Sequence, residues 1–182
     1  MYGLIHRAIR DCVSGEYGTD TWSRIQERAG VDESAFTSMQ AYPDEVTVGL
    51  LVSTAEEVEE DLPKLLHQFG RFWVLHTARM EYGPLFDFAG SDMQSFLENL
   101  NAMHEQVAIT FANLQQPSFT VEKIEDGNLL LHYESIRDGL SAFVIGLIEG
   151  LSEHFKEPTQ VEQVEAKAEG ADHDVFKLIF SS

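Results

Sequence analysis

The chain has 182 residues, of which 43% are hydrophobic and 10% aromatic, and its formal net charge is −19. This length accommodates one well-packed domain, and this composition is that of a globular protein rather than a disordered one. The negative charge argues against binding to nucleic acid or to an anionic membrane, because both would repel an acidic protein. It favours solubility and, if anything, a partner with a basic surface.

The single cysteine, Cys12, excludes an internal disulfide bond and is compatible with a reducing compartment. The first ten residues carry charges and contain no apolar segment of signal-peptide length. The most apolar segment, residues 140–151, is too short to cross a bilayer. We therefore expect a cytoplasmic protein. The densest acidic run, residues 56–61, is expected to be a solvated helix face.

The first two-thirds of the chain show the periodicity of amphipathic helices. Short helices are expected near the N-terminus, followed by a turn around Pro43. Two further helices are predicted over residues 44–52 and 62–76. The best-marked helix begins near Ser91, which has the S-x-x-Q spacing of a capping box with Gln94.

The helix that begins near Ser91 carries one histidine on its apolar face. Its apolar residues follow at three- and four-residue steps: Met93, Phe96, Leu97, Leu100, Met103, Val107 and Phe111. His104 lies on the same stripe and should point inward. A lone inward histidine is more often a hydrogen-bonded core residue than a metal ligand. His104 has no visible polar partner on its stripe, however, and a metal ion is one way to satisfy a buried imidazole.

The other six histidines do not form a zinc motif, because none lies three or four residues from another. They are His6, His67, His76, His132, His154 and His173. One histidine in an otherwise apolar pocket suits an iron whose remaining ligands come from a porphyrin. This pattern permits haem without identifying it.

After Pro117 the pattern changes from helical to extended. Apolar and polar residues alternate from Phe119, and Asp126-Gly127 is a hairpin-turn signal before a second extended run over residues 129–133. A helix then interrupts the strands.

This second apolar helix is predicted over residues 138–155, and two more strands are expected near residues 161–167 and 175–180. Helices followed by an antiparallel sheet that one helix interrupts indicate an α+β domain.

Three polar residues stand at alternate positions where the second strand should end: Tyr133, Ser135 and Arg137. In an extended segment these side chains project to one face, so two hydroxyl groups and one guanidinium would converge. Such a group suits a carboxylate, which arginine binds through two hydrogen bonds while the hydroxyls donate to it as well. Haem carries two propionates. The other interpretation is ordinary strand-end polar residues, with Arg137 paired to a nearby acid.

The segment Tyr133-Glu134-Ser135-Ile136-Arg137 resembles the Y-x-S-x-R haem-propionate motif of the H-NOX (haem nitric oxide/oxygen binding) family. Asp138-Gly139-Leu140 and the run at residues 144–148 resemble the haem regulatory domain of soluble guanylate cyclase. Met1-Tyr2-Gly3-Leu4 is similar to the N-terminus of that family. His104 lies about where the family has its proximal ligand, on a long helix ahead of a proline-initiated strand. The resemblance covers essentially the whole chain.

The resemblance implies the α+β H-NOX fold, as a single domain over residues 1–182. In this fold a helical distal subdomain, about residues 1–62, packs over a proximal subdomain, about residues 63–182. The proximal subdomain contains a four-stranded antiparallel sheet, and a b-type haem (iron protoporphyrin IX) lies between the two.

The resemblance also implies the roles of individual residues around the haem. His104 is the iron ligand, and Ile5 and Pro117 match positions that press on the porphyrin. The implied propionate anchors are Tyr133, Ser135 and Arg137.

Oxygen-binding members of the family have a tyrosine in the distal pocket, on the helix after the motif arginine, where its hydroxyl stabilises bound O₂. Phe143 falls at that place when the alignment starts from residues 146–150, and Ala142 when it starts from Arg137; neither donates a hydrogen bond. NO and CO need no such donor, so the resemblance implies a sensor of NO and CO that excludes O₂. Trp73 resembles another distal position, although a plain core aromatic explains it at least as well.

The resemblance implies a two-state switch, in which NO binds opposite His104, weakens the bond trans to it and changes the surface that a partner contacts. The chain has no P-loop, dinucleotide or nucleophile-elbow motif, so we expect no catalysis of its own. A partner in trans, a histidine kinase or a cyclic-dinucleotide enzyme, is a family-level expectation. The alternatives are a haem carrier or redox protein, an O₂-binding H-NOX domain, and a haem-free ligand-binding domain.

Overall fold

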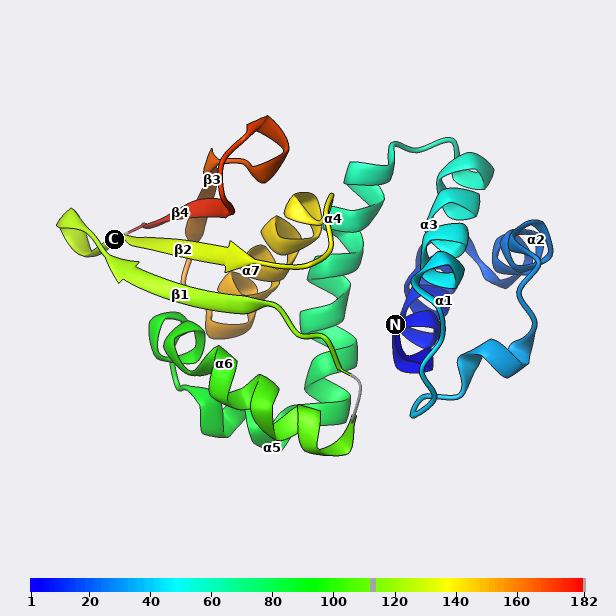
Figure 1. The fold of residues 1–182 in the computed structure, drawn as a ribbon, viewed down its shortest axis with the longest axis horizontal. Coiled ribbons are helices and arrows are strands. Elements are labelled where there is room, and N and C mark those ends of the chain that lie inside the picture. Colours follow the sequence, from blue (N-terminus) through cyan, green and yellow to red (C-terminus); the bar gives the residue numbers. More distant parts are fainter. Residues whose placement is uncertain (112–113, 182) are drawn as a thin grey trace. The chain divides into compact units, whose positions relative to one another are not determined.

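The computed structural model describes residues 1–111 and 114–181, and the chain divides into two compact units, Met1–Phe69 and Gly70–Ser182 (Figure 1). The division falls within one helix, α4 (Leu62–Phe72). The rest of the first unit consists of α1 (Gly3–Tyr17), α2 (Thr19–Ala29), the 3₁₀ turn η1 (Glu33–Phe36) and α3 (Asp44–Val58). Within residues 1–111 and 114–181, no helix is both long and apolar enough to cross a membrane.

The core of the first unit is built from the apolar faces of its helices. The buried residues recur at helical spacing, as expected from the sequence: Leu4, Ala8, Ile9 and Val13 on α1, Trp22 and Ile25 on α2, and Leu50 on α3. One polar pair lies inside this core, where His6 Nε2 and Thr47 Oγ1 are 2.9 Å apart. This hydrogen bond joins α1 to α3 and satisfies both side chains.

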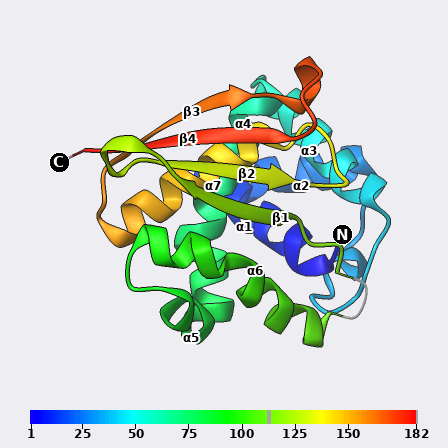
Figure 2. The same cartoon turned by 60° about the vertical axis from the view of Figure 1, so that its left-hand side comes forward.

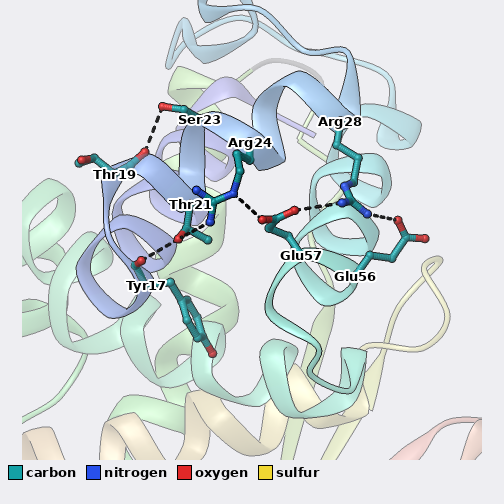
Figure 3. Close-up of polar contacts among 8 residues, drawn as sticks. All are labelled: Tyr17, Thr19, Thr21, Ser23, Arg24, Arg28, Glu56 and Glu57. Carbon is teal, nitrogen blue, oxygen red and sulfur yellow. Dashed lines mark hydrogen bonds and ion pairs between the residues drawn. The ribbon is translucent and has the colours of Figure 1, made fainter.

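The acidic run of residues 56–61 was expected to be a solvated face, and this expectation is wrong for Glu57. Arg24 Nε donates to Glu57 Oε1 over 2.6 Å and Arg28 Nη2 donates to Glu57 Oε2 over 3.0 Å, so α2 is tied to α3 (Figure 3). The side chain of Glu57 is only 14% exposed, whereas that of Glu56 is 58% exposed. Hydrogen bonding to Arg24 is the main reason why the pKa of Glu57 is lowered. This carboxylate is therefore part of a helix interface.

The second unit combines helices with one antiparallel sheet (Figure 2). Its helices after α4 are the π-helix η2 (Trp73–Ala78), α5 (Arg79–Ala89), α6 (Met93–Thr110) and α7 (Ser141–Phe155). Its strands are β1 (Ser118–Lys123), β2 (Leu129–Glu134), β3 (Thr159–Glu165) and β4 (Asp174–Phe180), with short 3₁₀ turns η3 (Glu125–Gly127) and η4 (Lys167–Glu169). The strand order is β1-β2-β4-β3, with every neighbouring pair antiparallel. The predicted α+β class and four-stranded antiparallel sheet are confirmed.

One face of the sheet carries the core of the second unit. Leu129, Leu131 and Tyr133 alternate with less buried residues along β2, as the period of two requires. Leu131 pairs with Phe176 on β4, which is fully buried. The same core includes residues of α6 and α7: Phe96, Leu97, Leu100, Val144, Ile148 and Leu151. The helices thus cover one face of the sheet.

Two helix boundaries differ from the sequence expectations. The capping box at the start of α6 uses Asp92 and Ser95, one residue later than the predicted Ser91 and Gln94: Ser95 N donates to Asp92 Oδ1 over 2.8 Å. A carboxylate is favoured there because it also interacts with the positive end of the helix dipole. The helix expected over residues 62–76 becomes a π-helix at Trp73. A π-segment changes the direction in which the following side chains project.

Two glycines bring the α4–η2 segment and α7 into close contact. A Cβ atom at Gly70 would lie 2.2 Å from the carbonyl oxygen of Phe143, and one at Gly150 would lie 2.9 Å from the Val74 Cβ. Only glycine therefore fits at Gly70, because the opposing atom is backbone and cannot rotate away.

Replacing Gly70 by alanine should destabilise the second unit. The added methyl group forces the helices apart, which costs about 1–3 kcal/mol in the free energy of unfolding. The matched control is Gly49→Ala in α3, where a Cβ meets nothing within 4 Å. That variant should gain up to about 1 kcal/mol from helix propensity. Urea unfolding of both variants measures the difference; equal stabilities would contradict the close contact.

Candidate cofactor site

Helix α6 places His104 at the end of its buried stripe. Its first two turns bury Met93, Phe96, Leu97 and Leu100, which confirms the apolar stripe predicted from the sequence. His104 follows Leu100 by one turn, and its ring is half-buried. The imidazole lies against the sheet, with its ring centroid 5.9 Å from that of Phe119 on β1. Phe119 in turn lies 5.3 Å from the ring of Tyr133.

Asn101 fixes the start of β1 against α6. Its Nδ2 donates to the carbonyl of Phe119 over 2.7 Å, and its Oδ1 accepts from the backbone N–H of Phe119 over 2.9 Å. Because His104 lies three residues after Asn101, one helix turn carries both residues toward β1. This role could not be predicted from the sequence, since a single asparagine on a helix gives no signal of its partner.

The imidazole of His104 contains an unsatisfied buried nitrogen. Its Nδ1 has no hydrogen-bond partner within the part of the chain that the structure describes. Burial lowers the pKa of His104 from 6.5 to about 4, and the nearby backbone of Pro117 acts in the opposite direction. The ring is therefore neutral at pH 7. A neutral imidazole with one unsatisfied ring nitrogen is the form that binds a metal ion, and coordination would satisfy that nitrogen.

Tyr133, Ser135 and Arg137 line one cavity of about 370 Å³ in the second unit. These side chains do not converge along an extended strand as the sequence predicted, because β2 ends at Glu134 and residues 136 and 137 form a bend. Ser135 Oγ accepts from the backbone N–H of Arg137 over 3.0 Å, which closes a serine turn. The three side chains therefore meet through a turn and not through strand alternation.

The Tyr133 hydroxyl is held in its protonated, donating form. Burial raises its pKa, and the hydrogen bond with Ser135 acts in the opposite direction. Arg137 extends the donor set, and its Nη1 already donates to the carbonyl of Gln115 over 3.0 Å. Hydroxyl and guanidinium donors that line one cavity suit an organic carboxylate.

Two acidic side chains also line this cavity, but both have partners. Asp138 Oδ1 forms an ion pair with Lys167 Nζ at 2.8 Å. The buried carboxylate of Asp174 accepts from Ser141 Oγ at 3.2 Å and from the backbone N–H of Lys167 at 2.9 Å. Their charges are thus partly compensated within the site. Lys167 and Asp174 were missed by the sequence analysis, because they belong to the β3–β4 region and approach the motif only in the fold.

The remaining predicted site residues lie elsewhere. Trp73 opens the π-helix and packs, partly buried, against the core of the second unit. Phe143 lies on the first turn of α7, and its carbonyl is the atom that Gly70 approaches. Pro117 precedes β1 beside the His104 ring. Ile5 lies in the first unit, half-buried on α1.

A metal centre made of several protein ligands is not present at this site. Within residues 1–111 and 114–181, no three His, Cys, Asp or Glu side chains are arranged to hold a metal ion together. A cofactor that supplies most of the metal's ligands itself, with one histidine from the protein, is compatible with His104.

Comparison with known proteins identifies the family. The model of the family described as haem-NO-binding matches residues 2–163. Soluble guanylate cyclase gcy-32 of Caenorhabditis elegans is 31% identical over 154 residues, which cover 82% of this chain and 22% of that relative. The chain thus corresponds to about a fifth of that enzyme's length. It belongs to the haem-NO-binding, or H-NOX, family.

Solved H-NOX structures share the whole fold. The Shewanella oneidensis H-NOX protein in its Fe(II)NO state superimposes with a TM-score of 0.90 at 19% identity, covering 100% of both chains. An oxygen-binding H-NOX domain related to soluble guanylate cyclases, solved as its oxygen complex, gives a TM-score of 0.83 at 21% identity, covering 100% of this chain and 96% of that one. The H-NOX fold is therefore common to an NO complex and an O₂ complex.

The lowered pKa of His104 predicts a pH-dependent stability of the haem-free protein. An unfolded histidine takes up a proton near pH 6.5, whereas folded His104 does so only near pH 4, so this contribution to stability is lost as the pH falls through that window. Between pH 7 and pH 5 the loss should be about 1–2 kcal/mol. Urea unfolding at both values measures it, and His104→Gln should lack this component. Identical pH dependence in both proteins would contradict the assignment.

Proposed function

We propose that the chain is a haem-based gas sensor that binds NO and CO at a ferrous, histidine-ligated b-type haem and excludes O₂. The observation that carries the proposal is the neutral imidazole of His104, with its buried Nδ1 unsatisfied in the described part of the chain. It lies in the same unit as a cavity suited to carboxylates, and the family model is that of haem-NO-binding proteins. A core histidine with a purely structural role would be expected to have partners for both ring nitrogens, whereas in His104 the backbone of Pro117 leaves Nδ1 unsatisfied among the described residues.

The residues of this chain hold the cofactor in two ways. His104 would provide a nitrogen ligand to the iron, and the Tyr133 and Ser135 hydroxyls with the Arg137 guanidinium would bind the propionates. Haem supplies an iron that binds diatomic gases and whose bond to His104 responds to them. Pro117 and Ile5 would contact the porphyrin ring. Apolar residues such as these would also limit the access of water to the iron.

Discrimination against O₂ follows from the side chains rather than from the fold, because H-NOX proteins of this fold include an O₂ complex and an NO complex. Bound O₂ is polarised and is stabilised by a hydrogen-bond donor, whereas NO binds iron strongly without one. Helix α7 contains no tyrosine, and Phe143 stands on its first turn. An apolar side chain at this position selects NO and CO. Trp73 is the one distal residue proposed here that carries an N–H donor.

The signal leaves the site through α6. Asn101 ties this helix to β1, so a change in the position of His104 is transmitted to the sheet through Phe119. We expect the output to be read by a separate partner in trans, a histidine kinase or a cyclic-dinucleotide enzyme, and not by catalysis in this domain. The acidic charge of the chain favours a partner with a basic surface.

The visible absorption spectrum of the haem-loaded protein tests this function. Reduced without oxygen, it should show a five-coordinate ferrous haem that shifts on adding NO and forms no stable complex in air. In His104→Ala the axial bond should be lost while the fold persists by circular dichroism. A stable oxygen complex would overturn the exclusion of O₂ and point to Trp73. Absence of haem uptake would overturn the whole proposal.

Removing the Arg137 charge tests the propionate assignment. Charge-assisted hydrogen bonds contribute about 1.5–3 kcal/mol, so Arg137→Gln should release haem roughly ten- to a hundred-fold faster. Transfer of haem to an excess of a haem-scavenging apoprotein, followed by absorbance, measures this rate. The control is Arg10→Gln, which removes an exposed arginine paired with Asp11 on α1 and should not change it. Equal rates in Arg137→Gln and the wild type would show that Arg137 does not bind the cofactor.

A further inference from the structure

Two histidines that are 41 residues apart in the sequence face each other at the end of the sheet. His132 Nδ1 on β2 lies 2.8 Å from His173 Nε2, which belongs to the bend immediately before β4. Each imidazole also has a carboxylate at its outer nitrogen. Glu122 Oε2 is 3.4 Å from His132 Nε2, and Asp172 Oδ2 is 3.4 Å from His173 Nδ1. The four side chains form a row in which two imidazoles lie between two acids.

The protons of this row do not balance for two neutral imidazoles. A neutral imidazole has one N–H and one bare nitrogen. If each outer nitrogen carries the proton and donates to its carboxylate, the two inner nitrogens oppose each other as bare lone pairs at 2.8 Å. If one inner nitrogen carries a proton, the outer nitrogen of the same ring faces a carboxylate without one. A cation between the inner nitrogens removes this conflict.

We propose that His132 and His173 bind one divalent transition-metal ion of the zinc class, with Glu122 and Asp172 as the outer hydrogen-bond acceptors. In such sites a histidine ligand donates its other N–H to a carboxylate, which fixes the tautomer and makes the ligating nitrogen more basic. Zinc–nitrogen bonds of about 2.0–2.1 Å at a tetrahedral angle hold the two nitrogens roughly 3.3 Å apart, so the rings need to separate by about half an ångström. Water completes the coordination shell.

The surroundings of the pair admit an ion from solvent. The two histidine side chains are 24% and 23% exposed, and Glu122 and Asp172 are 59% and 99% exposed. Among residues 1–111 and 114–181, no three His, Cys, Asp or Glu side chains are arranged to hold a metal ion together, so the protein would supply two ligands and water the rest. The net charge of −19 raises the local concentration of cations.

This metal site is separate from the candidate haem site but shares its strands. Tyr133 pairs with Asp174 across β2 and β4, and both line the carboxylate-binding cavity, whereas His132 and His173 are their immediate chain neighbours. Successive residues of a strand project to opposite faces, so His132 points away from the cavity that Tyr133 lines. The ligands of the two sites therefore do not overlap.

Zinc titration of the purified chain, followed by isothermal calorimetry, tests the proposal. We expect one equivalent of Zn²⁺ to bind to the wild-type protein, and binding to be lost in His132→Gln and in His173→Gln. Glu122→Gln and Asp172→Asn should weaken binding about ten- to a hundred-fold, as loss of an outer acceptor does in other metal sites. With Co²⁺ in place of Zn²⁺, visible absorption should report a low-coordinate site with nitrogen ligands.

Two controls make the outcome decisive. His76→Gln removes an exposed histidine that stacks on Phe72, outside the row, and should bind zinc like the wild type. His104→Ala should also retain zinc, so a failure of the haem proposal leaves this one testable. The proposal is overturned if the wild type binds no zinc, which would leave a shared proton as the cation of the pair. It is equally overturned if both histidine variants bind zinc as tightly as the wild type.

Discussion

The two hydrogen bonds between the Asn101 side chain and the backbone of Phe119 are the constraint on which the candidate haem site depends. They use the amide as both donor and acceptor, at 2.7 and 2.9 Å, so the register between α6 and β1 is fixed in both directions. His104 lies three residues after Asn101 on the helix, and Pro117 lies two residues before Phe119. The fixed register therefore brings His104 and Pro117 close together. Each bond contributes only about 0.5–1.5 kcal/mol to stability. Their importance is geometric, because they decide which backbone the imidazole faces.

The candidate site has two different environments, an apolar one around His104 and a polar one that suits carboxylates. In a chain as acidic as this one, the polar environment requires that the nearby carboxylates have partners of their own. Around His104 the surroundings are apolar enough to keep the ring neutral. In the cavity of Tyr133 and Arg137, two carboxylates are present, but Lys167 contacts both: its ammonium pairs with Asp138 and its backbone N–H donates to Asp174. The negative charge of the whole chain therefore does not determine the potential in this cavity. Nearby partners do, since electrostatic interactions weaken with distance and are screened by salt.

The sequence allowed prediction of whatever follows from periodicity and short motifs. The stripe of α6, the α+β class and the antiparallel sheet all depend on neighbours within a few residues, and the structure confirms them. The capping box was misplaced by one residue, because Ser91 and Asp92 are both good caps and only the backbone decides between them. The inward role of Asn101 could not be predicted, since its partner lies 18 residues away on another element. The same limit applies to Lys167 and to the pairing of the two histidines in the sheet.

Strand geometry explains how one short segment serves two purposes. Residues 132 and 133 are adjacent in β2, yet a strand projects them to opposite faces, so the segment presents an imidazole on one side and a phenol on the other. A similar arrangement occurs where β4 begins, with His173 immediately before the strand and Asp174 as its first residue, because the antiparallel register aligns Tyr133 with Asp174. A metal ion held by the two histidines would therefore link the same two strand ends that carry Tyr133 and Asp174. The ion would limit the distance between these two strand ends without contacting Tyr133 or Asp174. It would thus make the cavity more rigid from the opposite face of the sheet.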